Sequence, residues 1–117
     1  MKNELVELST DLAVEILKFR RKLKKELDDT ELLSQFVRSV TSIGANIREA
    51  NYGSSKSDFI NKLQISQKES NEADYWLDIF YKSEYISVED YNFLFGKLSK
   101  IRKILAASLK TAKKIEN

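Results

Sequence analysis

Proline is absent from this chain, and only three of its 117 residues are glycine. Tight turns depend on these two residue types, because glycine accepts positive φ angles and proline presets the φ of a turn. An all-β fold has many tight turns, so this composition favours long helices joined by few connections. A chain of this length forms one ordinary domain, which buries about two thirds of the surface that the unfolded chain exposes.

Apolar residues recur every three or four positions in four runs, which is the spacing of one face of a helix. Four helices with short connections predict an all-α fold, an antiparallel up-down-up-down four-helix bundle that occupies residues 1–117 as a single domain. The predicted core positions are Leu5, Leu8, Leu12, Ile16, Phe19, Leu23, Leu27; Leu32, Phe36, Val40, Ile43, Ile47, Ala50; Phe59, Leu63, Ser66, Ser70, Ala73, Leu77, Phe80; and Leu94, Leu98, Ile101, Leu105, Ser108, Leu109, Ala112, Ile115.

Predicted helix starts carry a capping signal, in which a side-chain oxygen accepts a hydrogen bond from a backbone N–H three residues later. The pairs with this spacing are Asp28 with Glu31, Ser55 with Asp58, and Ser87 with Asp90. They separate the four runs and place the second connection near Gly53.

The second run is rich in small residues between positions 39 and 50. Gly44 lies beside its core face, so we expect it to let a neighbouring helix approach closely. A single glycine within a helix is no phosphate loop, and the lysine and serine that end such a loop are missing. The outer face of this run is predicted to form a subunit contact through Arg38, Thr41, Ala45 and Arg48.

The chain contains no cysteine and no histidine, which excludes disulfides, thiolate zinc sites, thiol nucleophiles and imidazole bases. Four acids of the third run lie off its apolar face, so ion pairs with nearby lysines are favoured over a metal site. We therefore predict no enzymatic activity, no cofactor and no metal. The acids are Glu69, Glu72, Asp74 and Asp78, and the lysines are Lys62, Lys68 and Lys82.

Basic residues gather in two places, although the formal net charge is only +2. They can contact phosphates in a sequence-independent and salt-sensitive manner. The alternative is that they only keep two helix surfaces solvated and complement the helix dipole. The candidates are Lys18, Arg20, Arg21, Lys22, Lys24 and Lys25 in the first run, and Lys103, Lys110 and Lys114 in the fourth.

No uninterrupted apolar run approaches the roughly 20 residues that cross a bilayer, and the N-terminus has no apolar signal core. We therefore expect a cytoplasmic protein without a membrane partner.

Several motifs occur together at fixed separations: Arg38-Ser39, Ser42-Ile43-x-x-Asn46-Ile47-x-Glu49, Ser55-x-x-Asp58-Phe59 and Tyr75-Trp76-Leu77. With these motifs, the whole chain resembles the bacterial "four helix bundle protein" family, first noticed as open reading frames in intervening sequences of 23S ribosomal RNA genes. The resemblance implies a left-handed bundle that assembles into a ring-shaped homopentamer. It also implies kinship with the accessory variability protein of diversity-generating retroelements, a basic pentamer that binds nucleic acid and a reverse transcriptase. No catalytic residues come with it.

The expected function is therefore that of a non-enzymatic, oligomeric module that binds RNA or DNA through basic helix faces, as a ribonucleoprotein or reverse-transcriptase accessory protein. The alternative is a protein–protein scaffold whose charged faces have no nucleic-acid ligand.

Overall fold

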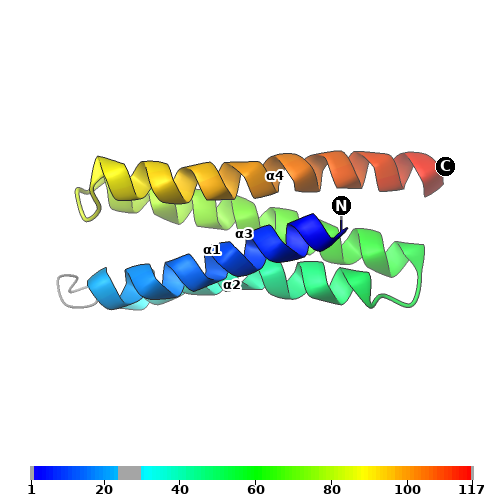
Figure 1. Ribbon diagram of the computed structural model, residues 1–117, viewed down its shortest axis with the longest axis horizontal. Coiled ribbons are helices and arrows are strands. Elements are labelled where there is room, and N and C mark those ends of the chain that lie inside the picture. The colour runs from blue at the N-terminus through cyan, green and yellow to red at the C-terminus, as the bar shows by residue number, and fades with distance from the viewer. Residues whose placement is uncertain (1, 24–29, 117) are drawn as a thin grey trace.

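Four helices make up the computed structural model, which describes residues 2–23 and 30–116 (Figure 1). They are α1 (Lys2–Leu23), α2 (Thr30–Asn51), α3 (Lys56–Lys82) and α4 (Val88–Glu116). No strand occurs in these two ranges, which confirms the predicted all-α fold.

Each helix packs against its two neighbours in the order α1, α2, α3, α4 and back to α1, and the backbones of the diagonal pairs do not touch within the described ranges. Sequential helices run in opposite directions, so the bundle has the predicted up-down-up-down arrangement (Figure 1). It measures 49 × 21 × 19 Å. The start of α1 and the end of α4 therefore lie toward the same end of the bundle.

The capping serines begin their helices as predicted. The Ser55 hydroxyl accepts a hydrogen bond from the Asp58 amide at 3.1 Å, and Ser87 accepts one from the Asp90 amide at the same distance. Each bond satisfies a backbone N–H that has no partner within the first turn of a helix. The third predicted pair depends on Asp28, which lies outside the described residues.

The core contains most of the predicted positions, with a shift at the starts of α2 and α3. Leu33 and Ile60 are buried there, whereas the predicted Leu32 and Phe59 are only partly buried against the core. The prediction was wrong at these two places because adjacent apolar residues at a helix start fit the same spacing equally well. Leu8 is also only partly buried, and Leu27 and the Ile115 side chain lie outside the described residues.

The closest packing joins α2 and α3, where the predicted face of α3 is small and polar. Ser66 and Ser70 are fully buried. The Ser66 hydroxyl donates a hydrogen bond across the helix pair to the Ile43 carbonyl oxygen at 2.8 Å, while Ser70 bonds to its own helix. Elsewhere along the same helix pair, the ring centroid of Phe36 lies 5.6 Å from that of Phe80. Burial of these hydroxyls is tolerated because each one has a partner.

Gly44 brings α1 against the other side of α2, as its sequence position suggested. A Cβ atom at Gly44 would lie 3.2 Å from the Ser9 hydroxyl oxygen and 3.4 Å from the Ser9 Cβ. Ser9 is itself buried and donates a hydrogen bond to the Val6 carbonyl. The space beside Gly44 is thus filled, and larger side chains do not fit without moving α1.

We expect Gly44→Leu to lower the free energy of unfolding by about 1–3 kcal/mol, because the added atoms overpack the contact with Ser9. The matched control is Gly96→Leu, since a Cβ at Gly96 meets nothing within 4 Å. Removing a helical glycine there should raise the free energy of unfolding by about 0.5–1 kcal/mol. Chemical denaturation followed by circular dichroism measures both values. Equal stability of the two variants would contradict the close approach at Gly44.

Candidate nucleic-acid interface

The carboxylates of α3 bind arginines of the two neighbouring helices. Arg38 of α2 lies between two of them, with Nη1 3.2 Å from Glu69 Oε2 and Nη2 2.7 Å from Glu72 Oε2. Arg102 of α4 places Nη1 3.2 Å from Asp74 Oδ2. These pairs join residues that are far apart in the sequence, so α3 is held electrostatically on both sides.

The prediction that lysines pair with these acids is therefore only partly correct. One predicted ion pair is present, with Lys82 Nζ 3.1 Å from Asp78 Oδ2. Lys62 instead lies 3.5 Å from Glu49 of α2, and Lys68 has no carboxylate partner among the described residues. No group of acids in the described ranges is arranged to hold a metal ion.

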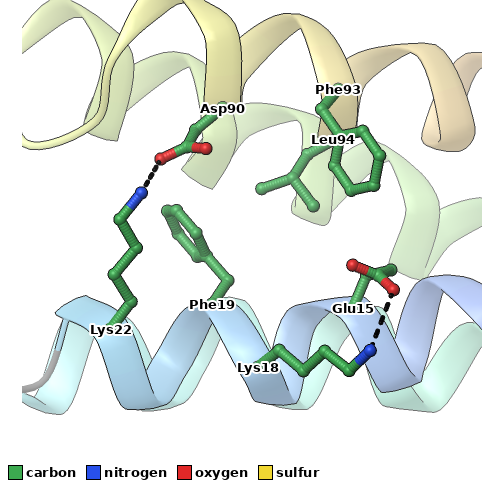
Figure 2. Close-up of a pocket in the computed structure, with 7 residues that line it drawn as sticks. All are labelled: Glu15, Lys18, Phe19, Lys22, Asp90, Phe93 and Leu94. Atoms are coloured by element: carbon green, nitrogen blue, oxygen red, sulfur yellow. Dashed lines mark hydrogen bonds and ion pairs between the residues drawn. The ribbon is translucent and has the colours of Figure 1, made fainter.

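The basic stretch of α1 faces acids of its own helix and of α4 (Figure 2). Lys22 Nζ lies 2.9 Å from Asp90 Oδ2, and Lys18 Nζ lies 3.6 Å from Glu15 Oε1. Together with Phe19, Phe93 and Leu94, these four residues line a hollow of about 170 Å³ between α1 and α4. Two of the predicted phosphate contacts are thus already paired with carboxylates.

The rest of that stretch is more open. Arg21 is exposed and Arg20 is half-buried, whereas the predicted contacts Lys24 and Lys25 lie outside the described residues. A cationic surface remains at this end of α1, but acids that line the adjacent hollow weaken its potential.

The basic residues of α4 lie toward the opposite end of the bundle. Because α1 and α4 are antiparallel, the stretch around Lys22 lies beside Asp90 near the start of α4. At 1.5 Å per residue, Lys103 and Lys114 lie about 20 and 36 Å further along α4 than Asp90. The two basic clusters therefore do not merge into one patch within a single chain.

A cationic surface covers the second half of α4, and we call it the α4 basic face. From Lys97 to Lys114 the sequence contains no acidic residue. Five lysines of this segment are exposed, and none forms an ion pair with a described carboxylate. They are Lys100, Lys103, Lys110, Lys113 and Lys114.

Near the turn between α3 and α4, aromatic rings stack on the surface. The Tyr91 centroid lies 4.3 Å from that of Tyr81 and 5.5 Å from that of Phe95, in nearly parallel orientations. Burial raises the pKa of the Tyr91 phenol above its ordinary value of 10.0, and the carboxylates of Asp78 and Asp74 raise it further. Sequence reasoning missed this cluster because its members come from two helices.

The outer face of α2 presents the residues predicted to contact another subunit. Ala45 is exposed and Thr41 is half-buried, with its hydroxyl bonded to the Val37 carbonyl of its own helix. The two arginines bracket this face, since Arg38 reaches α3 and Arg48 donates a hydrogen bond to the Thr10 hydroxyl of α1 at 2.9 Å.

None of the described helices is both long enough and apolar enough to cross a membrane.

Comparison with known proteins gives a family and a fold. The chain is similar to a protein of unknown function from the S23 ribosomal protein family of Bacteroides thetaiotaomicron, with 41% identity and a TM-score of 0.86. The alignment covers 94% of this chain and 99% of that one. No curated protein matches. The model of the 23S rRNA-intervening sequence protein family matches residues 1–107, and the chain therefore belongs to that family.

Proposed function

We propose that this protein is a non-enzymatic, oligomeric nucleic-acid-binding module and that the α4 basic face contacts the phosphate backbone. The observation that carries the proposal is the set of exposed lysines in the second half of α4 that have no described carboxylate partner. Unpaired surface cations attract a polyanion more strongly than paired ones, because no local acid offsets their field.

The α1 stretch contributes less in this proposal. Lys18 and Lys22 must give up their contacts with Glu15 and Asp90 before they contact phosphate. Arg20 and Arg21 remain as supporting contacts at that end of the bundle.

RNA is the favoured ligand. The family's description refers to 23S rRNA, although it says nothing about what this chain binds. The kinship with the retroelement accessory protein that the motif resemblance implies supports a role as a ribonucleoprotein or reverse-transcriptase accessory protein. A homopentamer is the assembly that the same resemblance favours.

Removing cations from the α4 basic face should weaken RNA binding in a salt-dependent way. We expect Lys103→Gln with Lys110→Gln to reduce affinity for single-stranded RNA and to lower the slope of log K against log salt by about 0.7 for each lysine. Filter binding at several salt concentrations measures both quantities.

The matched control for this experiment is Lys82→Gln, which removes a cation that is paired with Asp78. Lys82→Gln should leave the slope unchanged, and Lys18→Gln should change it less than Lys103→Gln. No RNA binding by the unmodified protein at low salt, or equal effects of Lys103→Gln and Lys82→Gln, would reject the α4 basic face as the RNA contact.

The subunit contact can be tested separately. We expect Ala45→Arg to produce smaller species in light scattering, because a long charged side chain would replace a methyl group at the proposed subunit contact. Gln64→Arg is the matched control, since Gln64 is exposed on α3. An unchanged mass for Ala45→Arg rules out this part of α2 as the contact.

The rival function is a protein–protein scaffold. The stacked rings of Tyr81, Tyr91 and Phe95 favour it, because Tyr81 and Phe95 are exposed and aromatic side chains are common in protein interfaces. Recovery of one stoichiometric protein partner after nuclease treatment, together with no RNA affinity, would support the scaffold over the nucleic-acid module.

A further inference from the structure

A polar groove lies between α3 and α4, next to the α4 basic face. It has a volume of about 310 Å³ and is lined by Gln67, Asn71, Ser99, Arg102, Lys103 and Ala106. Lys103 belongs to both surfaces, and Lys110 follows about 10 Å further along the same helix. The groove therefore shares Lys103 with the α4 basic face.

The lining of this groove is rich in hydrogen-bond donors and contains no carboxylate. The amides of Gln67 and Asn71 supply N–H groups, Ser99 supplies a hydroxyl and Lys103 supplies an ammonium group. A ligand with several acceptor oxygens and a negative charge satisfies such a set best, because charged acceptors form the strongest hydrogen bonds.

Arg102 orients part of the lining. Its Nη2 donates a hydrogen bond to Asn71 Oδ1 at 2.7 Å, while its Nη1 lies 3.2 Å from Asp74 Oδ2. Because the oxygen of Asn71 accepts from Arg102, its NH₂ group remains free to donate to a ligand. Asp74 offsets the charge of Arg102, so the uncompensated charge of the groove comes from Lys103.

The hollow between α1 and α4 differs from this groove because acidic residues line it. It also contains two lysines, but Glu15 and Asp90 line it as well and already bind them. A phosphate there would meet two like charges, which repel it. Donor-rich lining without acids distinguishes the groove between α3 and α4.

We propose that the groove between α3 and α4 binds a phosphate group through Gln67, Asn71, Ser99 and Lys103. The inference rests on the proposed function in one respect, because a nucleic-acid backbone is the favoured source of the phosphate. Lys110 can contact the next phosphate of the same backbone. Free phosphate has the same chemistry, and the experiment distinguishes the two sources.

Nuclear magnetic resonance locates the binding directly. The side-chain NH₂ signals of Gln67 and Asn71 are followed while inorganic phosphate, and in a second titration an oligouridine, is added at constant ionic strength. We expect the oligouridine to shift both signals in a saturable manner. A shift with the oligouridine alone identifies the backbone as the source, and a shift with inorganic phosphate shows that the free ion also binds.

An isosteric substitution tests the donor set. Gln67→Glu places a carboxylate in the groove and should reduce affinity for oligouridine by about tenfold or more. The matched control is Gln35→Glu, because Gln35 is exposed on α2, which does not border the groove, and the change in net charge is the same. Gln35→Glu should change affinity by less than about twofold. Thermal unfolding of both variants verifies that the bundle is intact.

The outcomes separate this inference from the proposed function. If oligouridine binds and Lys110→Gln weakens it, but the two amide signals do not move and Gln67→Glu equals Gln35→Glu, the groove is overturned and the nucleic-acid module stands. If inorganic phosphate shifts the two amides but oligouridine does not bind, the groove stands and the nucleic-acid module is overturned. If neither ligand has an effect, both are overturned.

Discussion

The close approach of α2 to both of its neighbours is the contact on which the rest of the bundle depends. On one side Gly44 lies against Ser9 of α1, and on the other Ser66 donates a hydrogen bond to the Ile43 carbonyl. Only small side chains permit these approaches, because interiors are packed without spare volume. With α2 and α3 in contact, Arg38 reaches both Glu69 and Glu72.

The antiparallel order then decides how the surface charges are distributed. It brings the basic end of α1 beside Asp90 and the acidic start of α1 beside Lys97, which lies 2.6 Å from Asp11. Exposed ion pairs of this kind each contribute about 0–1 kcal/mol, so apolar burial supplies most of the stability. Their larger consequence is that Lys18 and Lys22 of α1 and Lys97 of α4 are already bound to carboxylates. The lysines beyond Lys97 have no such partners among the described residues and remain available to a ligand.

The two ends of the surface between α3 and α4 also differ in chemistry, because acidic residues lie toward the turn but do not line the groove. Toward the turn, Asp78 lies near the stacked tyrosines and pairs with Lys82. Beyond Arg102 the acids end, and amides and Lys103 take their place. Arg102 marks the boundary, because it binds Asp74 on one side and orients Asn71 on the other. One helix pair therefore presents an aromatic, acidic surface and a donor-rich groove in succession.

The sequence alone determined the four helices, the caps at Ser55 and Ser87, most of the core and the small residue at Gly44. These features depend on spacing within a few residues, which a helix converts directly into one face. The sequence did not distinguish the core residues Leu33 and Ile60 from the neighbouring Leu32 and Phe59, because both choices fit the helical spacing. The sequence also gave no signal for the turn after α3, where Glu84, a residue other than glycine, has a positive φ of 67°.

Which charges pair, and where the grooves lie, depends on contacts between helices that the sequence does not reveal. Glu69 and Glu72 bind an arginine that is 31 and 34 residues away, and Lys22 binds an acid 68 residues away. The subunit contact and the nucleic-acid contacts stay predictions. A helix fixes the direction of its own side chains, but which side chains meet across two helices depends on their relative rotation and register, and long-range packing sets both.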